Sequence, residues 1–378
     1  MKNIIYSVLL FLLMCNCTNN TKKETLKDRI QGSWVDSNAE KVRNDNYVVP
    51  FKIPFGLNFQ KDSVDFFRQF AKYERDTSTH KMNFNAFAGF IPFQLKADSL
   101  FILNPIENHL EFKYTIDASL KDTLFLKRND TLLRTLKRLQ KQEKDTTSFD
   151  QIVLSRSGCY GICPVINISV RRNGNVLFYG ERNTDKLGLY KAQLSEQFTN
   201  YLFQKFEDIN ISKVADNYSV GHTDDETVST TFFQNGKIIK TIQDYGKAGT
   251  KELLWTYQAI ENLHKQLELT SISIDSIKPA FNDYYFEKES KRLSLKQSES
   301  FLLWYALQNA KVTTINFDNI YNFGGVYIYR NKYLKIESDG RFFKYFIKKG
   351  QTITYDIGYN FIERNFKEAD FKDKKTSY

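Results

Sequence analysis

The stretch "VINISVRRNGNVLFYG", residues 165–180, places two alternating segments on either side of Asn173-Gly174. Apolar and polar residues alternate with a period of two, which is typical of a strand with one buried face. Asn-Gly between such segments is the strongest short hairpin signal, because both residues tolerate positive φ. The stretch therefore predicts an antiparallel β-hairpin.

A second copy of this pattern, "VSTTFFQNGKIIKTIQDYG", occupies residues 228–246 and turns at Asn235-Gly236. Each hairpin precedes a helical pattern of apolar residues, within 194–202 after the first and within 253–260 after the second. Thr250 is the expected N-cap of the second helix. Residues 148–268 therefore predict an α+β domain in which two helices cover one face of an antiparallel sheet.

The chain before this domain consists of short alternating stretches, such as residues 56–59, 110–114 and 123–126. They predict an antiparallel barrel or sandwich over residues 29–137. The opening Gly32-x-Trp34 resembles the first strand of lipocalin-like barrels, and the resemblance implies that the tryptophan plugs one end. Such a barrel encloses one small ligand or fills with side chains, and we expect a filled core. Leucines recur every third residue from 133 to 139 among basic residues, which predicts a helical linker.

Residues 275–370 predict a C-terminal α+β segment with one helix. Ser298 is the expected cap of a helix that buries Phe301, Leu302 and Tyr305, and alternating strands follow at residues 326–330, 333–336, 341–346 and 352–355. Asp339-Gly340 supplies the hairpin turn. Whether this segment is an independent domain stays open, and the whole chain is expected to be α+β and β-rich.

The first residues are typical of an export signal. Lys2 precedes an apolar run, residues 4–14, which is too short for a membrane helix of about 20 residues and suits a signal peptide over residues 1–16. The cysteine after this run resembles the lipobox of bacterial lipoproteins, which implies acylation, a membrane anchor and an outer-membrane address. Cys17 is the favoured site, because the loss of Cys15 leaves an even pair of later cysteines; Cys15 and a plain secretory signal are the alternatives. Residues 17–28 are then a polar tether.

The charge pattern restricts the class of partner. The formal net charge is +10, and removal of residues 1–16 removes only Lys2, so that 10 − 1 = +9 remains. Such a charge favours anionic lipid or polysaccharide neighbours without specifying a fold. The densest basic run, residues 134–144, contains neither stacking aromatics nor a reading helix, so we expect no nucleic-acid partner.

Cys159 and Cys163 are the cysteines that remain in the body of the chain. In an exported protein they are expected to pair, and Gly158 and Gly161 allow the tight turn that this requires. A thiol-disulfide enzyme is the alternative, but an alternating strand follows Cys163 in place of a helix whose dipole would stabilise a thiolate. A zinc site lacks a second pair of ligands at matching spacing.

The string "GCYGICP", residues 158–164, followed by the Asn-Gly hairpin, resembles an uncharacterised domain family of bacterial lipoproteins over about residues 150–268. The resemblance implies an envelope address and a paired cysteine, and it supplies no catalytic residue. The chain departs from the family pattern at residues 224–226, where a proline often stands.

Other chemistry is sparse. His222, Asp224, Asp225 and Glu226 form the one dense group of candidate metal ligands, with a solvated charged loop as the alternative. The remaining histidines, His80, His109 and His264, stand without a partner at motif spacing, and common nucleophile, phosphate-binding and zinc motifs do not occur in the sequence. We therefore expect no catalytic residue and no cofactor.

These observations lead to a functional hypothesis with an open alternative. The chain is expected to be an envelope lipoprotein that binds a partner protein, a glycan or a small apolar ligand without catalysing a reaction. The alternative is a periplasmic enzyme, either thiol-redox at Cys159 and Cys163 or hydrolytic.

Overall fold

The computed structural model describes residues 24–36, 55–75, 82–140, 147–276, 278–325, 333–347 and 350–374. The predicted signal, Cys15, Cys17, His80 and the strand expected at 326–330 lie outside these ranges. The described chain forms two compact units, one of residues up to Val64 with Ile91–Leu139, the other of Asp65–Phe90 with residues from Gln140 onward. Within the described ranges, no helix combines the length and apolar character needed to cross a bilayer.

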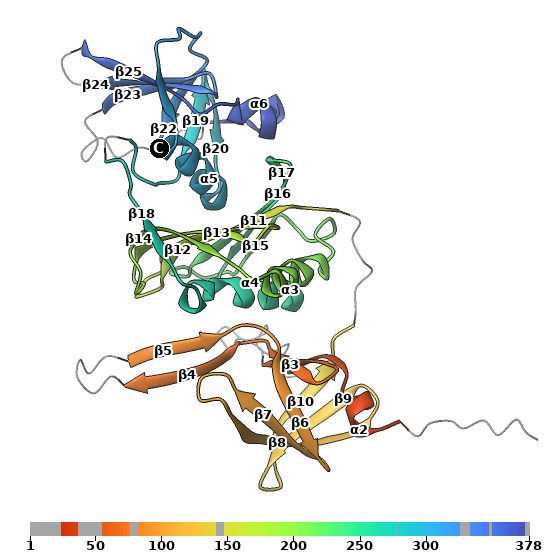
Figure 1. The fold of residues 1–378 in the computed structure, drawn as a ribbon. Coiled ribbons are helices and arrows are strands. Elements are labelled where there is room, and N and C mark those ends of the chain that lie inside the picture. Colours follow the sequence, from red (N-terminus) through yellow and green to blue (C-terminus); the bar gives the residue numbers. More distant parts are fainter. Residues whose placement is uncertain are drawn as a thin grey trace, which may run out of the picture. The chain divides into compact units, whose positions relative to one another are not determined.

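The first unit is a closed antiparallel barrel with the strand order β1-β10-β9-β8-β7-β6-β3-β2, of which Figure 1 labels β3 and β6 to β10. Its strands are β1 (Gly32–Asp36), β2 (Gly56–Gln60), β3 (Ser63–Phe66), β6 (Ile91–Lys96), β7 (Ser99–Asn104), β8 (His109–Leu120), β9 (Thr123–Arg128) and β10 (Thr131–Arg138). The short helix α2 (Leu26–Arg29) precedes β1, so helical structure begins inside the segment expected to be a tether.

Trp34 of the Gly-x-Trp motif lies in β1. Its side chain is fully buried, and its indole nitrogen donates to the carbonyl of Ile30 at 2.7 Å. The guanidinium of Arg138 lies 4.1 Å from the Trp34 ring centroid and donates to the carbonyls of Gln31 and Arg29 at 2.6 and 2.9 Å. The last strand thus closes over the first through a cation–π contact.

The predicted helical linker is wrong, because Leu133 and Leu136 lie in strand β10 and Leu139 directly follows it. Leu136 is fully buried in the barrel and pairs with Leu124 of β9. A register shift between Leu132 and Arg134 interrupts the alternation. A bulge of this kind leaves one extra residue in β10, and Leu133 is 48% exposed there, so the leucines at every third position do not share a buried face.

The predicted antiparallel sheet forms the centre of the second unit, with the order β15-β17-β16-β11-β12-β13-β14-β18. Only the β15–β17 pair within it is parallel. Its strands are β11 (Gln151–Arg156), β12 (Val165–Arg171), β13 (Asn175–Arg182), β14 (Gly188–Gln193), β15 (Asn217–Ser219), β16 (Thr227–Gln234), β17 (Lys237–Tyr245) and β18 (Thr270–Ile272). At the β16–β17 turn both Asn235 and Gly236 have positive φ, 52° and 73°, as the hairpin signal predicts.

Helices α3 (Glu196–Glu207) and α4 (Lys251–Glu261) pack on one face of this sheet, as predicted, and the 3-10 helix η2 (Leu263–Gln266) follows α4. Thr250 caps α4, and its hydroxyl accepts from the backbone N–H of Leu253 at 3.3 Å. Ile152 and Leu154 of β11 face these helices from the sheet.

The opposite face of the sheet is covered by the C-terminal segment, which contacts β11 and β16 through α5 (Gln297–Gln308). The predicted cap Ser298 is wrong, because α5 begins at Gln297 and its N-cap is Lys296, two residues before Ser298. Ser298 is fully buried, and its hydroxyl lies 2.6 Å from that of Ser229 and 2.7 Å from that of Thr231. The hydroxyls of Ser229 and Thr231 in β16 therefore bond to α5.

The C-terminal segment has its own sheet, in the order β21-β25-β24-β23-β22-β19-β20-β26. Its elements are β19 (Tyr285–Lys288), β20 (Lys291–Ser294), β21 (Lys311–Thr313), β22 (Tyr321–Gly324), β23 (Tyr333–Ser338), β24 (Phe342–Ile347), β25 (Thr352–Asp356), α6 (Phe361–Asn365), the 3-10 helix η4 (Glu368–Asp370) and β26 (Lys372–Asp373). Helix α6 is additional to the one predicted. Val153, Leu189 and Phe233 of the middle sheet share one core with this segment, so the two sheets form one unit.

Residues 65–90, expected within the barrel, group with the second unit and contain the hairpin β4 (Phe70–Arg75) and β5 (Met82–Phe87). Asp65 is 2% exposed and accepts from the hydroxyl of Tyr201 at 2.9 Å and the indole of Trp255 at 3.1 Å, and Lys205 forms an ion pair with it. A buried carboxylate requires such donors, and α3 and α4 supply them.

Candidate functional site

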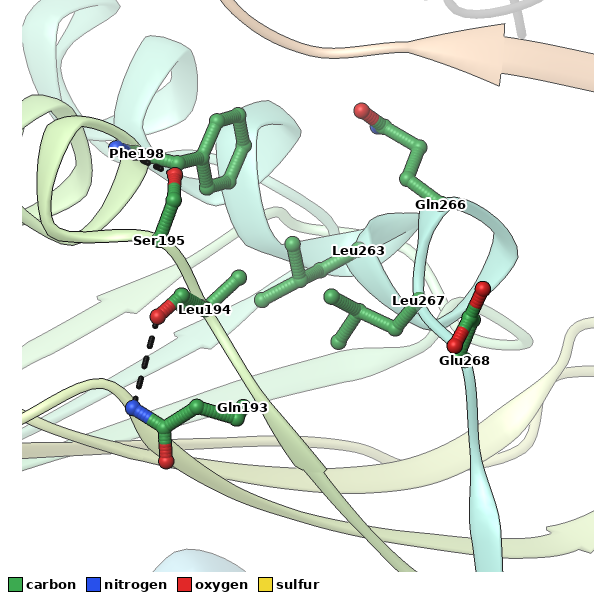
Figure 2. Close-up of a pocket in the computed structure, with 8 residues that line it drawn as sticks. All are labelled: Gln193, Leu194, Ser195, Phe198, Leu263, Gln266, Leu267 and Glu268. Carbon is green, nitrogen blue, oxygen red and sulfur yellow. Dashed lines mark hydrogen bonds between the residues drawn. The ribbon is translucent and has the colours of Figure 1, made fainter.

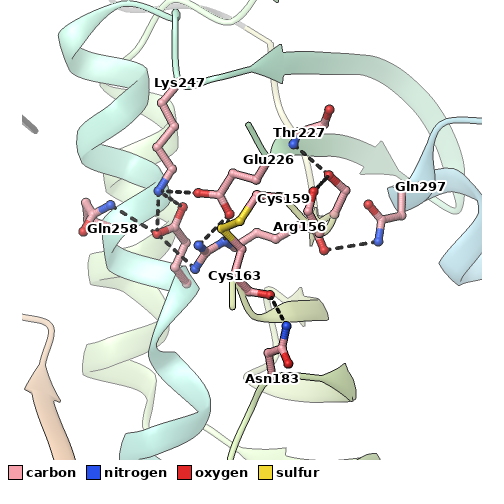
Figure 3. A network of polar contacts seen from close by, with 12 residues as sticks. Arg156, Cys159, Cys163, Asn183, Glu226, Thr227, Lys247, Gln258 and Gln297 are labelled. Atoms are coloured by element: carbon pink, nitrogen blue, oxygen red, sulfur yellow. Dashed lines mark hydrogen bonds and ion pairs between the residues drawn. A yellow bond between two sulfur atoms is a disulfide. The ribbon is translucent and has the colours of Figure 1, made fainter. Parts of the chain in front are cut away.

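The disulfide loop, residues 157–164, connects β11 to β12 and contains the predicted pair. Cys159 and Cys163 are bonded, with their Cα atoms 5.6 Å apart (Figure 3). The backbone N–H of Tyr160 donates to the carbonyl of Asp224 at 3.0 Å, and the side-chain amide of Asn183 donates to the carbonyl of Cys163 at 3.2 Å. Three loops therefore meet at this end of the sheet: the disulfide loop, residues 183–187 and residues 220–226.

Two apolar side chains project from the disulfide loop. Tyr160 is 89% exposed and Ile162 is 88% exposed, which are the two highest values among the large apolar side chains of the described residues. Leu187, on the adjacent loop, is 60% exposed. Single exposed apolar side chains are common, but an aromatic and an aliphatic side chain on a crosslinked loop resemble the anchors that dominate protein interfaces.

Beneath the loop lies the base network, which we define as Arg156, Glu226, Lys247 and Glu261. Arg156, the last residue of β11, donates from Nε and Nη2 to Oε2 of Glu226 at 2.8 and 2.6 Å, and its Nη1 lies 3.6 Å from Oε2 of Glu261 (Figure 3). Lys247 Nζ lies 3.1 Å from Glu226 and 3.0 Å from Glu261. Two cations and two anions thus neutralise one another.

Burial disfavours the charged forms in the base network, yet the opposite charges outweigh it. Burial alone would raise the pKa of Glu261, but Arg156 and Lys247 hold that pKa below its usual value. Burial likewise opposes the guanidinium, and Glu261 and Glu226 nevertheless raise the pKa of Arg156. The network therefore stays charged and ties the end of β11 to α4 and to the loop at 220–226.

His264 lies against the neighbouring loop at residues 183–187. Its ring stacks on Phe178 with centroids 4.5 Å apart, and its Nε2 lies 3.4 Å from Oδ1 of Asp185. Burial lowers the pKa of His264 to about 4, against the opposing effect of Asp185. The imidazole is therefore neutral at pH 7.

The candidate metal group at residues 222–226 does not converge on one point. Nε2 of His222 lies 2.6 Å from Oδ2 of Asp225, but both carboxylate oxygens of Glu226 face the base network. The carbonyl of Asp224 accepts from the disulfide loop. Among the described residues, the group whose ligand atoms do converge is Glu107, His109 and Glu111. The alternate spacing of His109 and Glu111 along one strand was the signal that sequence reasoning missed.

A pocket of about 360 Å³ lies between the start of α3 and η2 (Figure 2). Leu194, Phe198, Leu263 and Leu267 give it apolar walls, and its polar residues are Gln193, Ser195, Gln266 and Glu268. Its size falls at the lower end of the range of small-molecule sites.

The residues around Cys159 and Cys163 do not favour the alternative of a thiol-disulfide enzyme. Pro164 and strand β12 follow Cys163, and in the described chain no helix begins at either cysteine. Neither sulfur therefore has the helix N-terminus that commonly lowers the pKa of a reactive thiol.

Comparison with known proteins identifies one part of the chain. No curated protein and no solved structure matches it. Residues 150–264 match a family model, and this span contains the disulfide loop, both Asn-Gly hairpins, α3, α4 and all four members of the base network. The chain therefore carries, at residues 150–264, a domain of unknown function, DUF6438.

Proposed function

We propose that this chain is an envelope lipoprotein, acylated at Cys17, that binds a partner protein through the disulfide loop and catalyses no reaction. The observation that carries the binding role is the almost complete exposure of Tyr160 and Ile162 on a loop closed by a disulfide. An export signal and a lipobox-like cysteine support the envelope address.

The arrangement suits recognition because the loop is fixed before a partner arrives. The disulfide restricts its backbone, contacts from Asn183 and Asp224 hold its two sides, and the base network fixes the strand from which it starts. A preorganised loop loses less conformational entropy on binding, so more of the contact energy appears as affinity. A projecting aromatic and aliphatic pair suits an apolar pocket on a protein more than a polar glycan chain.

Site-specific photo-crosslinking in native cells tests this proposal. A photoreactive residue at position 160 should give a discrete crosslinked product, whereas the same residue at position 312 should not. Val312 is the matched control, because it is an apolar residue that is 68% exposed in the same unit.

The isolated partner then allows a quantitative measurement. The double substitution Tyr160→Ser and Ile162→Ser should weaken its binding by about 30-fold or more, the loss expected for one interface hot spot. Equal crosslinking from positions 160 and 312, or unchanged affinity of the double variant, would contradict the proposal.

The pocket beside α3 supports a second candidate, the binding of a small apolar ligand. Its leucine and phenylalanine walls would remove apolar surface from water. A fluorescent apolar probe should bind the wild-type chain and lose affinity in Leu267→Gln; equal binding by both proteins would exclude this site.

A further inference from the structure

Three metal-ligating side chains meet where β7 turns into β8. Glu107 lies in the turn, and His109 and Glu111 follow at alternate positions of β8, so these two share a face of the strand. One ligand atom from each of the three lies within 4.8 Å of the other two. Nε2 of His109 is 3.3 Å from Oε1 of Glu111. Two ligands at about 2.1 Å from a tetrahedral zinc-sized ion are separated by roughly 3.4 Å, so this pair already has nearly the required spacing.

A buried amide holds the two carboxylates together. Asn104 is 2% exposed, and its Oδ1 accepts from the backbone N–H groups of Ile106 and Glu107 at 2.9 and 3.1 Å. Its Nδ2 donates both to Glu107, at 3.4 Å, and to Glu111. Nδ1 of His109 lies 3.6 Å from Oε2 of Glu107, so the two carboxylates flank opposite nitrogens of the ring, and the imidazole must rotate or Glu107 must shift for all three residues to reach one ion. Asn104 is the partner that orients the two carboxylates. Partners of this kind orient metal ligands in proteins.

We propose that Glu107, His109 and Glu111 bind one divalent first-row transition-metal ion. An imidazole nitrogen favours zinc, copper, nickel or cobalt over calcium and magnesium, which prefer oxygen ligands alone. Three protein ligands leave a coordination position open to water. The side chains of Glu107, His109 and Glu111 are 39%, 53% and 25% exposed, so the ion exchanges freely with solvent.

Lys113 competes with a metal ion for the carboxylate of Glu111. It lies two residues after Glu111 in β8, and its ammonium forms an ion pair with Oε2 of Glu111. An incoming cation therefore meets repulsion from Lys113 and competes with it for the carboxylate. Removal of the lysine charge should tighten metal binding, an effect that non-specific binding elsewhere on the chain would not show.

Titration calorimetry with Zn²⁺ and the purified, untagged full chain tests the site. The wild type should bind one ion, and His109→Ala should weaken this binding at least about tenfold, since even loss of an orienting partner commonly costs that much. Lys113→Met should strengthen it several-fold. His222→Ala is the matched control, because His222 also lies beside a carboxylate, 2.6 Å from Asp225, but outside a convergent group of three.

The outcomes separate this site from the alternatives. Unchanged binding in His222→Ala with loss in both His109→Ala and Glu107→Gln would support the proposal, provided that circular dichroism shows the folded spectrum. Three results would overturn it: no saturable binding by the wild type, equal binding by all variants, or loss in His222→Ala alone.

Discussion

The base network should make Glu226 far more important for stability than an exposed glutamate in a similar pair. Glu226→Gln preserves the shape of the side chain but leaves Arg156 and Lys247 opposite a single carboxylate, Glu261. The Glu226 carboxylate accepts from Arg156 at 2.8 and 2.6 Å and lies 3.1 Å from Lys247, and its side chain is 11% exposed. Removal of one partner from a buried ion pair costs about 3–5 kcal/mol, and we expect about 3 because glutamine keeps one acceptor oxygen.

Glu207 provides the comparison. It pairs with Arg172, but both side chains are 41% exposed, so Glu207→Gln should cost at most about 1 kcal/mol. Urea unfolding followed by circular dichroism measures both variants. With a slope of about 3 kcal/mol per molar urea, Glu226→Gln should lower the midpoint by about 1 M. Equal midpoints for the two variants would refute the view that the base network stabilises this end of the sheet.

Three further changes have defined outcomes. Replacement of Cys159 and Cys163 by Ala removes a crosslink of sequence separation 4 and should lower the free energy of unfolding by about 2 kcal/mol on the loop-entropy model. Urea unfolding measures this loss, and a reductant should no longer change the unfolding midpoint of the variant. The unfolded chain binds a proton at His264 near pH 6.5 but the folded chain only near pH 4, so stability should fall by roughly 3 kcal/mol as pH drops through this window and level off below it. His264→Phe should remove that fall in pH-dependent melting curves, and an unchanged pH dependence would contradict the assignment. Asp65→Asn leaves Lys205 without its buried anion and should cost about 3 kcal/mol, so an unchanged melting temperature would show that this ion pair contributes little.

Local signals in the sequence predicted most of the secondary structure of the middle domain. Asn235-Gly236 needs only its own backbone preferences to make a hairpin, and the hydroxyl of Thr250 caps a helix three residues away. The α+β class and the barrel followed from the same period-two alternation. The leucine spacing around β10 misled because the leucines do not share a buried face: Leu136 is buried, whereas Leu133 is 48% exposed.

The parts that sequence reasoning missed depend on contacts between distant residues. Ser229 of β16 is fully buried and bonds to Ser298, 69 positions later. The base network joins Arg156 to Glu226 across 70 positions, and neither residue belongs to a recognisable motif. The pairing of Cys159 with Cys163 could be predicted from the sequence, because it depends on an exported compartment and on a turn of five residues, and the sequence indicates both.

The direct test of the whole account is the state of Cys159 and Cys163 in protein taken from native cells. Alkylation without reductant, followed by digestion and mass spectrometry, should recover the two cysteines as one crosslinked, unmodified peptide. Recovery of both as alkylated free thiols would contradict the account, because the loop that presents Tyr160 and Ile162 would then lack its covalent closure.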